Sequence, residues 1–437
     1  MTPKSQRLHI ALFGRRNAGK SSLINALTGQ PLAIVSDVPG TTTDPVHKAM
    51  EILPLGPVVL IDTAGIDDVG ELGELRKKKS YEVLEKTDLV LLVIESSIGF
   101  GEFEKEVVKK AEKTQTPVVY VINKIDLYKA DERKELSKKF NFEPVVLVSA
   151  LTGEGIDELK QTIIKYAPKN WTLPTVVGDL IEPGDVVVCV IPVDKAAPKG
   201  RLILPQQIVI RDIIDSEAMA MVVKERELKH SFQLLNKEPS LVVTDASVYN
   251  KVAADTPPHI RLTSFSILFA RYKGDLQTLV EGVKAVRDLK PSDRVLISEA
   301  CTHHPVEDDI GRVKIPRWLK AQVGGELEID VKAGGGPLPE NIKDYKLIVH
   351  CGACMLNRKE MISRIMQAKR ANVPIVNYGV IMAYIHGVLH RALSPFPHLQ
   401  SIVGETKDYL IEEVEILKKI KKKRSFAIAQ DDSLLSP

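Results

Sequence analysis

Two short segments hold most of the cysteine in this chain, and their residue types could bind a metal. Cys301-Thr-His303 comes first, and His350-Cys351-Gly-Ala-Cys354 follows after residues 304–349. Three of the four cysteines lie in these segments. Thiolates and imidazoles are the protein ligands of zinc and of iron–sulfur clusters. The sequence therefore predicts one metal site assembled from two distant parts of the chain.

Three cysteines leave a 4Fe-4S cluster one protein ligand short. The candidates for the fourth position are His303, His304, His350, Glu307, Asp308 and Asp309. An incomplete thiolate set leaves one iron exchangeable, which suits cluster assembly or transfer better than electron carriage. A closed zinc site is one alternative, and a set of unliganded core thiols is another. Zinc ribbons usually pair two Cys-x-x-Cys segments, so the Cys-x-His spacing here favours iron–sulfur.

Strands must deliver both segments to the same place. Residues 294–298 and 346–349 are short apolar runs typical of buried strands, and each half-site follows one of them. Open α/β sheets bind ligands at the C-terminal ends of their strands. Apolar residues then recur at helical spacing over 362–369, which predicts a helix soon after Cys354. Its N-terminal N–H groups would favour the thiolate form of Cys351 and Cys354.

A nucleotide-binding loop lies far upstream. Residues 8–13 indicate a buried strand, the loop Gly14-Arg-Arg-Asn-Ala-Gly-Lys20-Ser21 follows, and residues 22–27 continue as a helix. This is the GxxxxGKS pattern between the strand and the helix that it requires. Lys20 would reach the β- and γ-phosphates of a nucleotide, and Ser21 would bind Mg²⁺. The predicted phosphate-binding residues are Gly14, Asn17, Ala18, Gly19, Lys20, Ser21 and Ser22.

Three further motifs each follow an apolar, strand-like run, and together they predict a GTPase. The first is Asp62-Thr-Ala-Gly65, which would bind Mg²⁺ through Asp62 and sense the γ-phosphate through the Gly65 N–H. The second gives the base-binding residues Asn123, Lys124 and Asp126, and the third gives Ser149, Ala150 and Leu151. A carboxylate at Asp126 accepts two hydrogen bonds from guanine, which adenine cannot offer. The residues predicted to support hydrolysis are Lys20, Thr42, Asp62 and Gly65.

Two details refine the predicted GTPase. Ile66 follows Gly65, so the water-positioning glutamine of Ras-type enzymes is absent. Asn17 and the segment 40–44 resemble the TrmE–Era–EngA group of GTPases. That resemblance implies a K⁺ ion held by Asn17 beside the phosphates; alternatively, the asparagine only suits a tight loop. Thr42 is the expected switch ligand of Mg²⁺, with the threonines on either side as close rivals.

The remaining pattern predicts an α/β protein of three domains. A P-loop GTPase domain with a parallel sheet and flanking helices would span 1–170, and a small α/β dimerisation domain 178–264. A third α/β domain, which contains the two metal half-sites, would span 265–410, and 411–437 would be a basic helix end and a disordered tail. Within the second domain, strands are expected at 185–191, 241–244 and 261–265, and a helix at 207–224. Cys189 is expected to be a buried core thiol, and packing is favoured over metal binding for the pair His386 and His390.

Composition sets the outer limits. The 437 residues carry a formal net charge of +3, and 5% of them are aromatic, which argues against a nucleic-acid-binding surface. No apolar run is long enough for a membrane span, and no hydrophobic leader precedes the first strand. Four cysteines in so long a chain do not suggest a disulfide scaffold. The cytoplasm is therefore the expected compartment.

The combination of motifs resembles the HydF family of FeFe-hydrogenase maturation GTPases. The two metal half-sites lie behind a TrmE-like GTPase, and the segments 177–185, 197–206 and 309–316 also match that family. The resemblance implies a 4Fe-4S cluster on Cys301, Cys351 and Cys354 with a variable fourth ligand. It implies a homodimeric scaffold or carrier. It also implies two radical-SAM partners, HydE and HydG, whose diiron precursor the chain would receive and deliver to the apo-hydrogenase. GTP turnover would then act as a timing switch.

The main competing interpretation is a TrmE-like, RNA-associated GTPase with a structural zinc. A redox enzyme is a third class, but the chain lacks a flavin or nicotinamide fingerprint and a complete cysteine set. Uptake of iron and sulfide would separate the first interpretation from the second.

Overall fold

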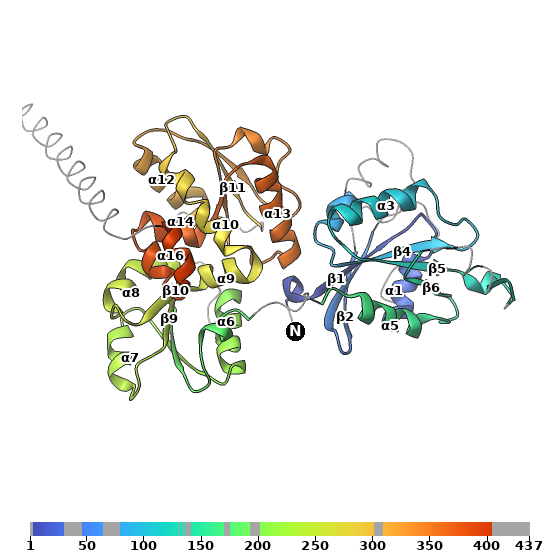
Figure 1. The fold of residues 1–437 in the computed structure, drawn as a ribbon, viewed down its shortest axis with the longest axis horizontal. Helices are drawn as coiled ribbons and strands as arrows, with labels where there is room; N and C mark the ends of the chain where they lie inside the picture. The colour runs from blue at the N-terminus through green and yellow to red at the C-terminus, as the bar shows by residue number, and fades with distance from the viewer. Residues whose placement is uncertain are drawn as a thin grey trace, which may run out of the picture. The chain divides into compact units, whose positions relative to one another are not determined.

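The computed structural model describes residues 3–29, 46–63, 79–129, 131–133, 136, 140, 142–169, 175–192, 202–300 and 309–403. The chain divides into two compact units. The first contains residues 1–173 together with 335–338 and 355–367, and the second contains the rest. Figure 1 labels many of the helices and strands of both units.

The first unit is built on a six-stranded sheet in the order β2-β3-β1-β4-β5-β6. Only the pairing of β2 with β3 is antiparallel. The strands are β1 (Leu8–Phe13), β2 (Val46–Ile52), β3 (Gly56–Asp62), β4 (Leu89–Glu95), β5 (Val118–Asn123) and β6 (Val145–Leu147). The described helices of the sheet's two faces are α1 (Lys20–Thr28), α3 (Glu102–Lys113) and α5 (Ile156–Tyr166). The predicted parallel sheet with flanking helices is confirmed.

Alternation along β1 explains why the sheet has helices on both sides. Leu8, Ile10 and Leu12 belong to one buried cluster, which also contains apolar residues of α1 and α5. Ala11 and Phe13 belong to a second cluster, together with apolar residues of α3. Because successive side chains of a strand point to opposite faces, a fully apolar strand needs cover on both. In Figure 1, α3 lies on one side of the sheet and α1 and α5 on the other.

The second unit contains two four-stranded sheets, and every strand pairing in them is parallel. The first has the order β10-β9-β7-β8. Its strands are β7 (Val186–Val190), β8 (Met219–Val223), β9 (Leu241–Thr244) and β10 (Arg261–Ser264). Its helices are α6 (Leu204–Asp215), α7 (Leu228–Leu234), α8 (Tyr249–Asp255) and α9 (Phe265–Lys273). Cys189 lies in β7 with no exposed surface, which confirms the predicted core thiol, and burial raises its pKa to about 12.

The helix expected over 207–224 was wrong in its second half. Helix α6 ends at Asp215, and Glu217 takes a left-handed conformation with φ of +58°. Residues 219–223 then form β8, which pairs in parallel with β7. The run Met-Ala-Met-Val-Val suits either a helix or a strand by composition, so pairing with β7 decides its structure.

The second sheet of this unit has the order β12-β11-β13-β14. The strands are β11 (Arg294–Ser298), β12 (Glu328–Lys332), β13 (Leu347–His350) and β14 (Ile375–Asn377). The surrounding helices are α10 (Leu276–Glu281), α11 (Lys284–Arg287), the π-helix η5 (Ile310–Lys314), α12 (Ile315–Val323), α13 (Arg358–Ala371), α14 (Tyr378–Ile385), α15 (Leu389–Ala392) and α16 (Pro397–Val403). Strands β11 and β13 are neighbours, and Ser298 pairs with His350 at their C-terminal ends.

Two further predictions, on the packing of His386 and on membrane-spanning segments, can be compared with this fold. The ring of His386 packs edge-on against Trp318, with ring centroids 5.0 Å apart, which agrees with a packing role. Within the described part of the chain, no helix is both long enough and apolar enough to cross a bilayer.

Candidate GTP site and metal centre

The loop between β1 and α1 depends on two glycines. A Cβ atom on Gly14 would lie 2.4 Å from the carbonyl oxygen of Val93. A Cβ atom on Gly19 would lie 2.2 Å from the side-chain nitrogen of Asn123, and Gly19 has φ of +87°. Only glycine meets both demands, since it has no Cβ and adopts positive φ without strain. The two glycines therefore let the loop pack closely against β4 and Asn123.

Lys20, Ser21 and Asp62 form hydrogen bonds within the predicted phosphate site. Lys20 is 8% exposed, and its Nζ donates hydrogen bonds of 2.9 Å to the carbonyl oxygens of Gly14 and Arg15. The Ser21 hydroxyl donates to Asp62 Oδ2 at 2.6 Å. Burial raises the pKa of Asp62, and the hydrogen bond from Ser21 and the charge of Lys20 oppose that effect. A hydroxyl and a carboxylate side by side are ligands that Mg²⁺ prefers.

Asn123, one of the predicted base-binding residues, connects the phosphate loop to the segment that follows β6. Asn123 Nδ2 donates to the carbonyl oxygen of Ala18 at 2.8 Å, and its Oδ1 accepts the N–H of Ala150 at 3.0 Å. Asp126 accepts a 2.6 Å hydrogen bond from the Ser149 hydroxyl, which orients its carboxylate. One buried amide thus ties the phosphate loop to the loop that would face guanine.

Three further predicted residues of this site, Lys124, Leu151 and Asn17, fall within the described residues. Lys124 adopts φ of +66° and forms an ion pair with Glu95 at 3.0 Å. Leu151 is 84% exposed. Asn17 is exposed and has φ of +61°, so the loop conformation alone suits an asparagine, and the K⁺ role stays a prediction. Thr42 and Gly65 lie outside the described residues.

Sequence reasoning missed an anchor of the phosphate loop. The guanidinium of Arg15 binds the carboxylate of Glu104 through two hydrogen bonds of 2.8 and 2.9 Å. Glu104 is 1% exposed, and it also accepts the N–H of Gly101 at the start of α3. The GxxxxGKS pattern allows any residue at position 15, so it contains no signal for this pair.

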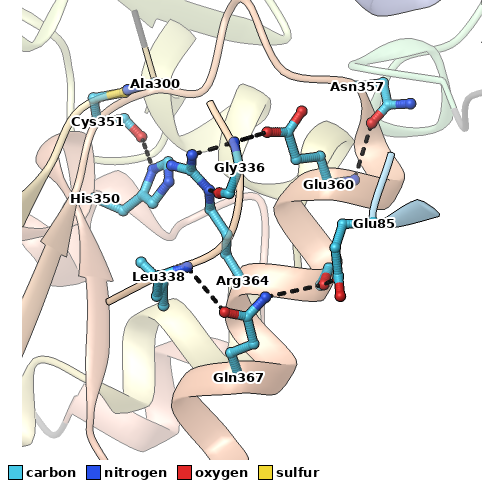
Figure 2. A network of polar contacts seen from close by, with 11 residues as sticks. Glu85, Ala300, Gly336, Leu338, His350, Cys351, Asn357, Glu360, Arg364 and Gln367 are labelled. Atoms are coloured by element: carbon cyan, nitrogen blue, oxygen red, sulfur yellow. Dashed lines mark hydrogen bonds and ion pairs between the residues drawn. The ribbon is translucent and has the colours of Figure 1, made fainter. Parts of the chain in front are cut away.

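At the predicted metal site, a hydrogen bond joins the segments after β11 and β13. Cys351 directly follows β13, and its N–H donates to the carbonyl oxygen of Ser298 at 2.9 Å. The N–H of Ala300 donates to the sulfur of Cys351 at 3.1 Å (Figure 2). An N–H donor stabilises a thiolate and orients it. Cys301 follows Ala300 in the sequence but lies outside the described residues.

The second half-site ends in a tight turn before α13. Ala353 adopts φ of +54°, and Cys351 and Cys354 are both partly exposed. Helix α13 begins four positions after Cys354, and the N–H of Glu360 is capped by the Asn357 side chain at 2.9 Å. The N–H donor at Cys351 thus comes from Ala300, and the predicted contribution of the helix stays a prediction.

Short contacts hold the first turns of α13 in place. Glu360 accepts the N–H of Gly336 at 2.8 Å, and Arg364 Nε donates to the Gly336 carbonyl at 3.0 Å (Figure 2). Gln367 accepts the N–H of Leu338 at 2.9 Å. Arg364 is 1% exposed, so these bonds are shielded from water. They fix the helix that follows the Cys351–Cys354 turn in the sequence.

Two of the fourth-ligand candidates fall within the described residues. His350 is fully buried, and its Nδ1 lies 2.8 Å from the carbonyl oxygen of Cys351. A carbonyl only accepts, so Nδ1 of His350 donates the proton of this hydrogen bond. Asp309 accepts the N–H of Arg312 at 2.8 Å and so caps η5. The other candidates, His303, His304, Glu307 and Asp308, lie outside the described residues, as does one of the three cysteines.

The donor set fits an iron–sulfur cluster in its chemistry. Two partly exposed thiols follow one strand, and a backbone N–H is aimed at the first of them. Among the described residues, no three His, Cys, Asp or Glu side chains already form a metal cage. The predicted third thiolate is not among those residues. The fit therefore rests on the types and partners of Cys351 and Cys354.

Three residues near this edge were not predicted. Glu299 is 1% exposed and binds Arg312 through hydrogen bonds of 2.7 and 3.2 Å. Tyr378 begins α14, and its hydroxyl is buried. The segment 309–316 gave a signal for Arg312, but only as part of a resemblance. The sequence contains no signal for Glu299 or Tyr378, because neither belongs to a motif and their positions near Cys351 depend on the order of the strands.

Comparison with known families assigns all three parts of the chain. Residues 9–124 match the 50S ribosome-binding GTPase model. Residues 176–274 match the hydrogen maturase F dimerization domain, and residues 277–395 match the hydrogen maturase F tetramerization domain. Two successive domains of the same maturase thus follow a GTPase domain.

The curated relatives named here each match little more than a third of this chain. GTPase Der of Wolinella succinogenes is 36% identical over 178 residues, which is 38% of each chain. The tRNA modification GTPase MnmE of Nitrosomonas europaea is 38% identical over 161 residues, covering 37% of this chain and 35% of that one. The match therefore spans little more than a third of the length of these curated relatives. Among solved structures, Era of Aquifex aeolicus has a TM-score of 0.34 and 25% identity, covering 52% of this chain and 98% of that one.

The motifs, the sheet and the matched models agree. The N-terminal unit is a P-loop GTPase domain, and the two sheets of the second unit fall one in each of the two maturase domains. The chain belongs to the hydrogen maturase F family of GTPases.

Proposed function

We propose that this chain hydrolyses GTP and serves as a scaffold that carries a 4Fe-4S cluster during maturation of FeFe-hydrogenase. The cluster would be held by Cys301, Cys351 and Cys354, with His303, His350 or Asp308 as candidates for the fourth position. The observation that carries the metal part of this proposal is the 3.1 Å hydrogen bond from the Ala300 N–H to the Cys351 sulfur. It joins the segments that contain the two half-sites.

The chemistry of the donors supports this assignment. A cluster held by three thiolates supplies one iron with an exchangeable position, at which a ligand or a second metal unit can attach. The chain's own residues hold the thiolates in place. Cys351 is fixed by the N–H of Ala300 and by its own bond to Ser298. The buried Glu299, paired with Arg312, stiffens the same edge without adding net charge.

The nucleotide would act as a switch on this scaffold. Mg²⁺ would be bound by Ser21, Asp62 and Thr42, and K⁺ by Asn17. Lys20 now donates to two loop carbonyls, and a bound nucleotide would offer its phosphates to the same ammonium group. Hydrolysis removes the γ-phosphate, so a contact that Lys20 would make with GTP is lost with GDP, and such a difference can bias partner binding. The proposed partners are the radical-SAM proteins HydE and HydG and the apo-hydrogenase, and the proposed compartment is the cytoplasm.

The proposed scaffold is an oligomer, and β8 supplies a reason. This strand is at the edge of its sheet, and Met219 and Val222 on it are 56% and 49% exposed. Soluble proteins normally protect an edge strand with charges, prolines or a covering segment. An uncovered apolar edge fits pairing with a second copy, as the dimerization name of the matched domain suggests.

Anaerobic reconstitution with iron and sulfide tests the proposal. The wild-type chain should take up about four irons and give an EPR signal on reduction. Cys351→Ala should lose the cluster and keep GTP hydrolysis. Cys189→Ala is the matched control, because Cys189 is buried in a different sheet, and it should load normally. Tightly held zinc that iron cannot displace would contradict the proposal.

A further inference from the structure

Tyr378 is carried to the same edge of the sheet as Cys351. Strand β14 pairs in parallel with β13, and its last residue, Asn377, is in register with His350. Cys351 directly follows β13, and Tyr378 directly follows β14. When neighbouring parallel strands end in register, the residues that follow them lie at the same edge of the sheet. The tyrosine therefore begins α14 beside the strand that delivers the cysteine.

The hydroxyl of Tyr378 is buried and lacks a hydrogen-bond partner among the residues that the structure describes. It lies against Gly311 in η5, where an added Cβ atom would be only 2.0 Å from the hydroxyl oxygen. Burying a polar group without a partner costs about 1–3 kcal/mol. A glycine that makes room for such a group, instead of an apolar side chain that fills the space, calls for an explanation.

The surroundings of this hydroxyl are rich in acceptors and negative charge. Burial raises the pKa of Tyr378 well above its ordinary value, and the negative charges of Cys351, Glu299 and Asp309 act in the same direction, against Arg312. Both carboxylates already accept other hydrogen bonds, from Arg312. Of the three negative groups, the Cys351 sulfur is the one that would also be a ligand of the proposed cluster.

We propose that the hydroxyl of Tyr378 donates a hydrogen bond to a sulfur of the loaded metal centre, either the Cys351 thiolate or a cluster sulfide next to it. This inference rests on the function proposed above. A hydrogen bond to sulfur stabilises the more negative, reduced state of a cluster, so it raises the reduction potential. Tyr378 thus tunes the cluster without being one of its ligands.

Tyr378→Phe tests this inference, since it removes only the hydroxyl. The variant should load as much iron as the wild type, but its cluster should have a more negative midpoint potential and shifted EPR g values. Tyr345→Phe is the control. The Tyr345 hydroxyl donates to Asp330, and Tyr345 precedes β13 at the opposite end of the sheet. Its loss should leave both readouts unchanged.

Thermal unfolding gives a second readout that separates this role from simple packing. Without a cluster, Tyr378→Phe should unfold at the same temperature as the wild type or higher, because it removes an unsatisfied buried group. Cluster loading should then raise the unfolding temperature of the wild type more than that of the variant. Equal potentials and equal g values in the two loaded proteins would overturn the inference and leave the scaffold proposal intact. A wild-type chain that takes up no cluster would overturn both.

Discussion

The backbone N–H of Ala300 points at the sulfur of Cys351 across 3.1 Å, although 51 positions separate the two residues. Strands β11 and β13 are neighbours, and Ser298 and His350 end them in register. The bond therefore depends on the sheet order, which two sequence motifs alone do not contain. Together with the bond from the Cys351 N–H to the Ser298 carbonyl, it links Cys351 to the segment that leads to Cys301.

Removing that N–H should weaken the metal centre. Ala300→Pro has no backbone donor, so the Cys351 sulfur would lose its hydrogen bond. We expect incomplete cluster loading, measured as iron per chain after anaerobic reconstitution, with GTP hydrolysis unchanged. Ala300→Ser keeps the N–H and is the control. Full loading of a well-folded proline variant would show that this donor is dispensable.

The Arg15–Glu104 pair should hold the phosphate loop in its binding conformation. Glu104→Ala leaves a partly buried guanidinium without its partner, which costs about 1–3 kcal/mol of stability. We expect weaker GDP binding as well, measured by calorimetry, because Arg15 also provides a carbonyl to Lys20.

Glu102→Ala is the matched control for this prediction. Glu102 lies in the same helix, but its side chain is 90% exposed and pairs with the exposed Lys105. Its removal should change stability by less than about 0.5 kcal/mol. Equal effects of the two substitutions would argue against an anchoring role for Glu104.

Guanine selectivity should depend on Asp126. Asp126→Asn replaces a carboxylate, which accepts two hydrogen bonds, by an amide that accepts at one end only. Hydrogen bonds to a charged group contribute about 1.5–3 kcal/mol, so GDP affinity should fall roughly ten- to hundredfold. Ser149→Ala keeps the carboxylate but removes the bond that orients it, and its effect should be smaller. Unchanged GDP affinity in Asp126→Asn would refute the assignment.

Much of this architecture could be predicted from the sequence, for a physical reason. Each GTPase motif is a short continuous segment that follows an apolar run. The residues of the nucleotide site can therefore be recognised directly in the sequence. The two predicted metal half-sites likewise follow apolar runs, which form β11 and β13, while the metal itself stays a prediction. The error over residues 219–223 came from a segment whose composition suits both structures, where pairing with β7 decides. Tyr378 and Glu299 could not be predicted, because their meaning arises only when β11, β13 and β14 lie side by side.

The edge strand β8 should mediate self-association. Met219→Lys places a charge on an exposed apolar edge, which discourages strand pairing between copies. We expect a smaller assembly in analytical ultracentrifugation, with nucleotide binding unchanged. Leu53→Lys is the control, since Leu53 is 78% exposed in the turn between β2 and β3. An unchanged assembly in the Met219 variant would exclude β8 from the interface.

Asn17 allows the ion and the loop conformation to be tested separately. If the asparagine holds K⁺, hydrolysis should be faster in K⁺ than in Na⁺ at equal ionic strength. Asn17→Gly retains the ability to adopt φ of +61° but has no side-chain oxygen. It should therefore keep the slow rate measured in Na⁺ and lose the acceleration by K⁺. If the glycine variant responds to K⁺ as the wild type does, the asparagine serves the turn and the ion is bound by other groups. Asn17→Ala, which disfavours positive φ, should in addition weaken GDP binding because the loop is strained.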